Sequence, residues 1–410
     1  MHRAHVKNTI RYYILLIALL AFLFFSNDFG LLDVQKTAII TAAGIDREGD
    51  EFIVTSQLAI PQTNGQSKQT ESVQIVSRGK TIADAFDQIN AKTGWYPKLV
   101  FCNLIVLGEE TTKQNVFDAL DFFLLDEYLS DDCLVATCDG LATDVLNTKP
   151  LVDPSSSIAI GKVLSAHAKR VGATLPVTLR EFASDYFSDS SSAYLPILKT
   201  EPQQEKIGQN NQNTQNSAQN SAQDSESTPQ GSNQTPNAQT DKPVFSAGET
   251  ALFVKGKRVG RLNASETLAF STVKSKLRLA PYSVERRENT CALNIKNNAA
   301  KLQLHTGKDG RAQLKIRLSL TAGLLDYSKA LPLNDGADTG DVPSGVFYAA
   351  EQKLTSEILS VYEKSRACGC DLFGTRDLLI KHASKKLRHY ADTILQNCTL
   401  TVDVHFKNVR

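Results

Sequence analysis

The chain has 410 residues, of which 41% are hydrophobic and 22% are charged, a composition that is ordinary for folded domains. Its 45 basic and 44 acidic residues leave a net charge of +1, so no basic excess favours binding to nucleic acid. Seven cysteines over this length exclude a small disulfide scaffold, and their odd number leaves at least one thiol unpaired within the chain.

The N-terminal segment, residues 1–30, has the pattern of a membrane anchor. Basic residues precede an apolar run from Tyr12 to Phe25, and the first acidic residue, Asp28, follows it. Basic residues on this side predict a single membrane pass with a cytoplasmic N-terminus and the bulk of the chain outside. The side chains expected to contact lipid are Tyr12, Ile14, Leu16, Leu19, Phe22 and Phe25.

Two alternatives to an anchor remain open at this point, because the run is shorter than the about 20 residues of a typical spanning helix. A cleaved signal sequence is the first, but Phe24 and Phe25 place rings where a cleavage site needs small side chains. A buried core helix is the second, and the basic flank argues against it. A lipid anchor is not expected, because no cysteine occurs before Cys102.

The sharpest change of composition falls at residues 201–243, where Gln, Asn, Ser, Thr and Pro dominate. Such a segment has too little apolar surface to offset the entropy lost when a backbone becomes ordered. We therefore expect a disordered linker here, between an N-terminal domain at 31–200 and a C-terminal domain at 244–410.

Strand and helix patterns alternate in the N-terminal domain. Strand patterns, either alternating or continuously apolar, occur at Thr37–Gly44, Phe52–Ile60, Val100–Leu107 and Cys133–Cys138. Helices are expected after N-caps at Thr81 and Thr111, and at Ser157–Lys169 and Thr178–Phe187.

The C-terminal domain opens with strands, which form expected hairpins around Lys255-Gly256-Lys257 and Lys308-Asp309-Gly310. Two helices and an alternating strand at 400–406 follow. The first helix has one apolar face made by Phe347, Ala350, Leu354, Ile358 and Val361. Together these patterns predict an α+β protein with two or more mixed domains, whose largely antiparallel sheets are packed by helices.

No residue pattern identifies a catalytic, cofactor or metal site. His382 and His389 are seven residues apart, too far for a pair of metal ligands on one helix. Gly79-Lys80-Thr81 resembles the end of a phosphate-binding loop, but Gln74 stands where the first glycine belongs. We expect a protein that is not an enzyme, although carboxylates distant in sequence can still meet in a fold.

The cysteines give no stronger signal. Cys368-Gly369-Cys370 lacks the two-residue spacing of redox and zinc sites. Cys291 and Cys398 lie on expected strands of the same domain, which leaves a disulfide between them open.

Several segments occur in the order found in the Ger(x)C family of spore germination proteins. Ala42-Ala43-Gly44-Ile45-Asp46 resembles the Gly-Ile-Asp that closes the family's first segment. The helix start at Gly79-Lys80-Thr81 and the strand Val100–Leu107, followed by Gly108-Glu109-Glu110, are similar to its next segments. Beyond the linker, 248–262 resembles the family's C-terminal hairpin, and Asp371-Leu372-Phe373-Gly374 resembles the turn between its two long helices.

This resemblance implies a non-catalytic C subunit of a nutrient-germinant receptor, which acts as a scaffold or coupling protein on the outer face of the spore inner membrane. The implied partners are the other membrane subunits of the receptor and, through the N-terminal helix, membrane lipid. Family members usually carry a lipidated cysteine near the position of Gly30-Leu31-Leu32-Asp33, so a protein anchor is expected to replace the lipid here.

Two functions from other classes remain as alternatives. A cell-envelope hydrolase would show carboxylates or a liganded histidine converging in one cleft. A small-molecule binding module for a nutrient would show an apolar pocket with a few polar groups.

Overall fold

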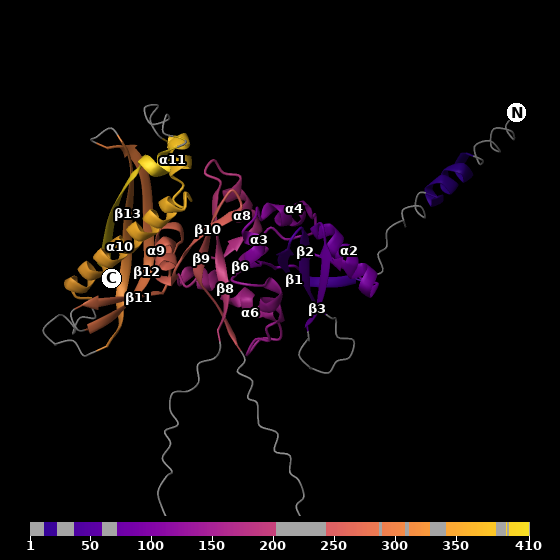
Figure 1. The fold of residues 1–410 in the computed structure, drawn as a ribbon, viewed down its shortest axis with the longest axis horizontal. Coiled ribbons are helices and arrows are strands. Elements are labelled where there is room, and N and C mark those ends of the chain that lie inside the picture. Colours follow the sequence, from indigo (N-terminus) through magenta and orange to yellow (C-terminus); the bar gives the residue numbers. More distant parts are fainter. Residues whose placement is uncertain are drawn as a thin grey trace, which may run out of the picture.

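The computed structural model describes residues 12–22, 37–59, 72–201, 243–286, 289–307, 311–328, 342–382, 391 and 393–409. Two β-sheets, each covered by helices, lie side by side in Figure 1. The fold is mixed α+β, as the sequence predicts. The expected disordered linker and the second expected hairpin turn, at 308–310, lie outside the described residues.

The first sheet has the strand order β10-β9-β8-β6-β5-β1-β2-β3, with β4 beside β1 and β7 beside β6. Its strands are β1 (Thr37–Glu48), β2 (Glu51–Ala59), β3 (Ser72–Gly79), β4 (Tyr96–Lys98), β5 (Leu104–Leu107), β6 (Leu134–Cys138), β7 (Val177–Thr178), β8 (Ser192–Glu201), β9 (Val244–Val254) and β10 (Lys257–Leu262).

Most strand pairs are antiparallel, as expected, but the centre of this sheet is parallel, which the expectation does not include. Strands β1, β5, β6 and β8 run parallel to one another, while β2, β3, β9 and β10 pair antiparallel. Parallel neighbours need crossover connections, and helices between the strands supply them. The continuous apolar run of β5 was the available signal, because parallel strands are buried on both faces.

Helices cover both faces of the first sheet. On one face, α2 (Ile82–Thr93), α4 (Phe117–Leu125) and α8 (Leu179–Tyr186) bury their apolar side chains against the strands. On the other face, α5 (Ala142–Asn147) and α6 (Ser156–Val163) do the same. The short helices α3 (Glu109–Thr112) and α7 (Ala166–Arg170) complete this part of the chain. Side chains of β5 alternate between the two clusters, as a doubly covered strand requires.

The expected N-caps were right in one case and wrong in another. Thr81 and Asp84 form a capping box at the start of α2, as predicted. Thr111 instead lies inside α3, and its hydroxyl donates to the Ile45 carbonyl at 2.9 Å. The same threonine pattern therefore fits either an N-cap or a position inside a helix. For Thr111, the contact with Ile45 of β1 accompanies the second outcome.

The two halves of the sequence share the first sheet. β8 and β9, which lie on either side of the expected linker in the sequence, pair antiparallel from Ser192↔Val254 to Glu201↔Val244. Figure 1 shows β9 and β10 beside β8 in the middle of the molecule. The sequence division at 201–243 therefore separates two neighbouring strands of one sheet.

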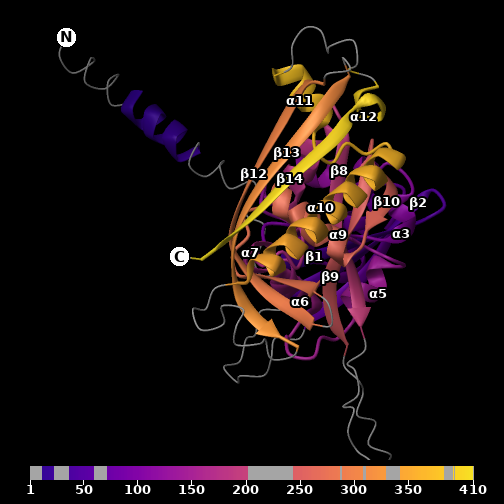
Figure 2. The same ribbon diagram turned by 90° about the vertical axis from the view of Figure 1, so that its left-hand side faces the viewer.

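The second sheet has the order β11-β12-β13-β14 and comes from the C-terminal half alone. Its strands are β11 (Ala280–Arg286), β12 (Asn289–Thr306), β13 (Ala312–Tyr327) and β14 (Thr399–Asn408), and its helices are α9 (Ala264–Lys274), α10 (Ser344–Ala367), α11 (Thr375–His382) and α12 (Ile394–Asn397). The predicted apolar face of α10 is buried in the core cluster of this sheet. Figure 2 shows α10 beside the sheet. The predicted terminal strand is β14, which pairs parallel with β13.

Candidate functional site

Asp46, the last residue of the Gly-Ile-Asp motif, is only 2% exposed. Its carboxylate accepts hydrogen bonds from the backbone N–H groups of Ala142, at 2.7 Å, and Thr143, at 2.9 Å. The Thr143 hydroxyl donates to it as well, at 2.8 Å. These N–H groups form the first turn of α5, where helical backbone donors lack intrahelical partners and favour a negative charge. Asp46 therefore caps α5 and fixes it against β1.

A second motif segment meets Asp46 in the fold. The Gly108 N–H donates to the Ile45 carbonyl at 2.9 Å, and a Cβ at Gly108 would overlap the Asp46 carboxylate. Only glycine leaves room for this carboxylate. We call Asp46, Gly108, Ala142 and Thr143 the Asp46 corner. It brings together the Gly-Ile-Asp motif and the segment that begins at Gly108, which are far apart in the sequence.

Asp371, the first residue of the Asp-Leu-Phe-Gly motif, occupies a similar environment and is 7% exposed. Its carboxylate accepts from the backbone N–H groups of Thr375, at 2.8 Å, and Arg376, at 2.7 Å. It thus caps the first turn of α11. Gly374 has a φ of 63°, a left-handed conformation that favours glycine and closes the turn between α10 and α11.

The turn that contains Asp371 also joins the C-terminal helices to the first sheet. The backbone N–H of Asp371 donates to the Ser192 hydroxyl at 2.9 Å, at the start of β8. The neighbouring Cys370 thiol donates to the Phe253 carbonyl of β9 at 3.5 Å. We call Asp371, Cys370, Ser192 and Phe253 the Asp371 corner. Burial raises the pKa of the Cys370 thiol to about 12, so this thiol stays protonated and is a poor nucleophile near neutral pH.

A surface ion-pair network also spans β6 to β10. Asp139, just after β6, pairs with Arg258 at 2.9 Å and with Arg261 at 3.1 Å, and Arg261 continues to Glu249 at 3.4 Å. Burial alone would raise the pKa of Asp139, but hydrogen bonds and charge from the two arginines outweigh it and lower this pKa. The network links residues from before and after the 201–243 segment of the sequence.

The acidic side chains nearest the Asp371 corner line a very small cavity. Asp185 and Asp377 face it together with Asp371 and Lys274, and burial raises the pKa values of Asp185 and Asp377. Its volume of about 30 Å³ matches one water molecule and leaves no space for a substrate. A larger groove, of about 400 Å³, lies between α4 and α8 and is lined by Leu124, Leu179 and Phe187 among others.

Within the described part of the chain, no group of three or more histidine, cysteine or acidic side chains has a geometry that could hold a metal. His382 is at the end of α11, and His389 lies outside the described residues. Cys368, at the end of α10, is half-buried, and Cys370 follows it in the turn before α11. The thiols of Cys368 and Cys370 are both free.

The disulfide left open by the sequence, Cys291–Cys398, is wrong. Both thiols are free and buried. Cys291 pairs with Tyr327 at one end of β13, whereas Cys398 precedes Thr399, which pairs with Gln313 at the other end. Fourteen residues of strand separate these levels by about 45 Å, whereas a disulfide needs Cα atoms within about 7 Å.

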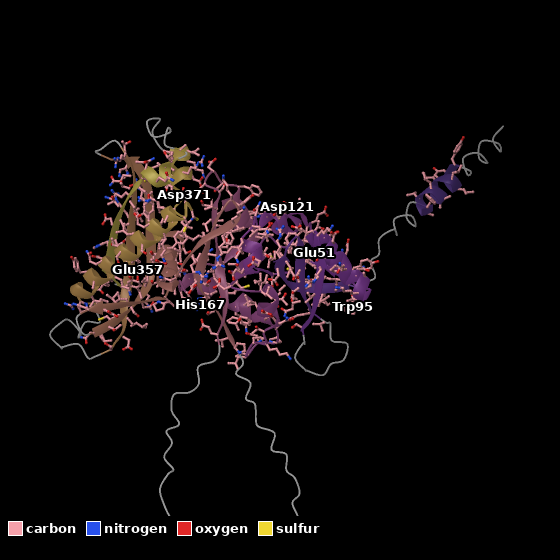
Figure 3. The ribbon with its side chains drawn as sticks, viewed as in Figure 1. Glu51, Trp95, Asp121, His167, Glu357 and Asp371 are labelled. Atoms are coloured by element: carbon pink, nitrogen blue, oxygen red, sulfur yellow. The ribbon has the colours of Figure 1, made fainter. Side chains whose placement is uncertain are left out.

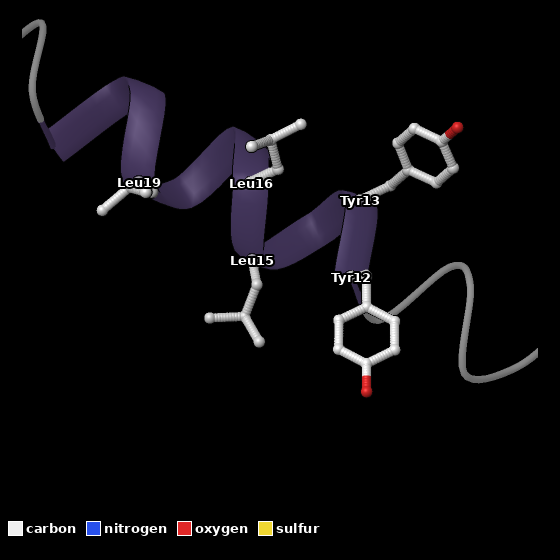
Figure 4. A pocket seen from close by; sticks show the side chains of 5 residues that line it. All are labelled: Tyr12, Tyr13, Leu15, Leu16 and Leu19. Carbon is white, nitrogen blue, oxygen red and sulfur yellow. The ribbon is translucent and has the colours of Figure 1, made fainter.

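The predicted anchor is described only in part. Residues 12–22 are helical, and the expected lipid-contacting side chains among them, from Tyr12 to Phe22, are 52–72% exposed. Figure 4 shows Tyr12, Tyr13, Leu15, Leu16 and Leu19 along this helix. Phe25 lies outside the described residues. In the ranges that the structure covers, no helix has the length and apolarity needed to cross a bilayer.

Several residues that hold this framework together carried no signal in the sequence. Ser192 lies in a serine-rich stretch, and Asp139 is an acid that follows a strand. Each acquires its role only through a partner that is distant in the sequence. Asp46 and Asp371 stand out in the sequence through the family resemblance. Asp371 caps a helix that begins four residues after it, whereas the role of Asp46 depends on α5, which begins 96 residues later.

Comparison with known proteins agrees with this reading of the motifs. The family model "Spore germination protein N-terminal domain" matches residues 32–200, and "Spore germination B3/ GerAC like, C-terminal" matches residues 248–410. A curated relative, spore germination protein B3 of Bacillus subtilis (strain 168), is 27% identical over 171 residues. That alignment covers 40% of this chain and 44% of the relative, so it spans less than half of either protein.

A solved structure shares the fold. The crystal structure of the GerBC protein aligns with a TM-score of 0.51 over 90% of this chain and 97% of its own chain, at 16% identity. The two family models together cover most of the chain, in the order that the motifs predict. The chain therefore belongs to the Ger(x)C family of spore germination proteins.

Proposed function

We propose that the chain is the non-catalytic C subunit of a nutrient-germinant receptor and that it acts as a membrane-tethered scaffold outside the membrane. The observation that carries this proposal is the use of both motif aspartates as helix caps. Asp46 and Asp371 each direct their carboxylate oxygens to backbone N–H groups within the fold. Motif residues that hold elements together favour a protein whose surfaces act on partners.

The proposed partners are the other membrane subunits of the receptor, with lipid as a further contact through the apolar run at Tyr12–Phe25. The basic flank of that run supports an orientation with the folded part outside the cytoplasm. On this proposal the chain sits at the inner membrane of the spore.

Deletion of the gene, in a strain without related copies, tests the proposal. We expect nutrient-triggered germination to be lost, while germination by a receptor-independent trigger is unchanged. The full-length chain should restore the response, and a secreted chain without residues 1–30 should not. Normal nutrient germination after the deletion would contradict the receptor role. Full rescue by the chain without residues 1–30 would contradict only the need for a membrane tether.

A nutrient-binding module is a second candidate, and the groove between α4 and α8 is the observation in its favour. Phe123, Leu124 and Leu179 give it an apolar lining, and the Arg180–Asp131 ion pair adds polar groups. Titration calorimetry of the full-length chain with amino acids and sugars tests this role. Heat of binding that a Leu124→Glu variant abolishes would favour it over the scaffold. For the hydrolase alternative, the acid-lined cavity of about 30 Å³ offers no space for a glycan.

A further inference from the structure

The chain enters the first sheet along one well-defined edge. Because β1, β5, β6 and β8 are parallel, their N-terminal ends lie along the same edge of the sheet, with the loops that precede them. β1 begins there at Thr37, and only residues 26–36 separate it from the apolar run. That segment can span at most about 40 Å. The N-terminal edge is therefore the part of the first sheet tied most closely to the proposed tether.

Exposed aromatic side chains are concentrated on this edge. Between residues 37 and 409 of the described chain, the exposed phenylalanines and tyrosines are Tyr96, Phe101, Tyr128, Phe187 and Tyr348. All except Tyr348 precede a parallel strand on this edge. Leu125, which is 75% exposed at the end of α4, and Val100, which is 45% exposed, lie in the same loops. Single exposed apolar residues are common, but such a cluster marks an interaction surface.

Contacts place two of these side chains, Tyr96 and Tyr128, close to the start of β1. Tyr96 on β4 pairs directly with Thr37, the first residue of β1. Lys98 places its Nζ 5.1 Å from the centre of the Tyr128 ring, which joins the β4 loop to the loop after α4. Trp95 is half-buried beside Tyr96, at the end of the molecule far from Glu357 in Figure 3. We call Trp95, Tyr96, Lys98, Val100, Phe101, Leu125 and Tyr128 the aromatic edge.

We propose that the aromatic edge docks onto the lipid bilayer and inserts its rings into the interfacial layer, so that the first sheet stands on the membrane with its N-terminal edge down. This inference rests on the proposed tether, which brings the edge within reach of the bilayer. Tryptophan and tyrosine favour the boundary between lipid and water. A lysine there can lay its carbon stem along apolar surface and keep its charge in water.

The charges around the edge decide what kind of lipid contact it makes. Four acids, Asp126, Glu127, Asp131 and Asp132, lie in the loop after α4, and Asp131 pairs with Arg180. Against them, the edge itself carries Lys98. Attraction to anionic lipid therefore does not drive the contact; apolar insertion does. Docking on zwitterionic vesicles should be at least as strong as on anionic ones, unlike that of a polybasic surface.

Trp95 makes this inference directly testable, because it is the single tryptophan of the chain. The full-length protein is reconstituted into phosphatidylcholine vesicles, with and without lipid brominated near the headgroup end of its acyl chains. We expect Trp95 emission to be lower in the vesicles with brominated lipid than in those without it, because a ring at the interface lies close to the bromine atoms. Unchanged emission, with Trp95 still quenched by iodide from the water, overturns the proposal.

Two variants separate the aromatic edge from general exposure of apolar side chains. Phe101→Ser combined with Leu125→Ser should restore most of the quenched emission. Tyr348→Ser is the matched control, since Tyr348 is 64% exposed and Phe101 is 61% exposed, and it should leave the quenching unchanged. Circular dichroism confirms that both variants are folded. Equal quenching in the edge variant and the control contradicts docking through this edge.

Flotation of the same vesicles separates this inference from the tether. A chain that does not float overturns the tether and the docking together. A chain that floats without lipid quenching overturns the docking alone. Protection of Trp95 from iodide only when other receptor subunits are present would assign the edge to a protein partner and likewise overturn contact with lipid.

Discussion

Both motif aspartates cap a helix, but the corners around them connect different parts of the molecule. Asp46 ties α5 to β1: β1 is a strand of the first sheet, and α5 is one of the helices that pack on this sheet. Asp371 caps α11, but its backbone also binds Ser192, so its corner joins the C-terminal helices to a strand from the other half of the sequence. The Asp46 corner therefore stabilises contacts between the first sheet and one of its own helices, whereas the Asp371 corner connects the first sheet to the C-terminal helices. Substitutions in the two corners should therefore separate the stability of the fold from the connection between the first sheet and the C-terminal helices.

The largest loss is expected for Asp46→Ala. The substitution leaves the Ala142 and Thr143 N–H groups buried without an acceptor, which costs about 3 kcal/mol of the free energy of unfolding. Urea unfolding followed by circular dichroism measures it. Asp118→Ala is the control, since Asp118 is half-exposed and pairs with Arg47 at 3.6 Å, and about 0.5 kcal/mol or less is expected. Equal losses would contradict the capping role.

Asp371→Ala should cost about 2 kcal/mol, because α11 loses the acceptor of two N–H groups near its start. Hydrogen exchange should increase in α11 and also at the start of β8, unlike in the Asp46 variant. Asp377→Ala, in the first turn of the same helix, is the control. Faster exchange confined to α11 would show that this corner does not couple the layers.

Ser192→Ala isolates the coupling, because it removes the acceptor of the Asp371 N–H and leaves the α11 cap intact. We expect a loss of about 1 kcal/mol. Hydrogen exchange should rise at Asp371 while the α11 amides stay protected. Ser190→Ala, in the loop before β8, serves as the control, and a similar change there would assign the effect to the loop.

Asp139→Asn tests the surface link between β6 and β10, and the smallest effect is expected, about 0.5 kcal/mol after solvent screening. Because the pKa of Asp139 is lowered in the folded protein, the ion pairs contribute fully above the ordinary value of 3.8 and are lost as the pH falls further. The difference in unfolding free energy between wild type and variant should therefore vanish in strong acid and shrink with added salt. A difference that persists in acid would assign it to packing.

Local patterns predicted local structure well. The capping box at Thr81, the buried face of α10 and the alternation of β14 all follow from residues within one element, and the structure has each of them. The hairpin at Lys255-Gly256 was also predictable, because Gly256 has a φ of 75°, which favours glycine.

Features that depend on distant partners were not predictable. Nothing in the sequence of β9 and β10 shows that they extend a sheet formed by residues before 202, and nothing in the spacing of Cys291 and Cys398 gives their separation along β13. The parallel centre of the first sheet was missed although the continuous apolar run of β5 fits a strand buried on both faces, because such a run does not show in which direction its neighbours lie. The candidate site was visible only as motif residues, without their partners.

The pairing of Glu201 with Val244 has a practical consequence. The ends of the Gln/Asn/Ser-rich segment are held side by side by β8 and β9, so that in topological terms the whole segment is the loop of a hairpin. Doubling the length of such a loop adds only about 0.6 kcal/mol to the entropy of closing it. A fluorescent protein or an affinity tag placed between residues 202 and 242 should leave both sheets intact, which gives a reporter position that avoids both chain ends.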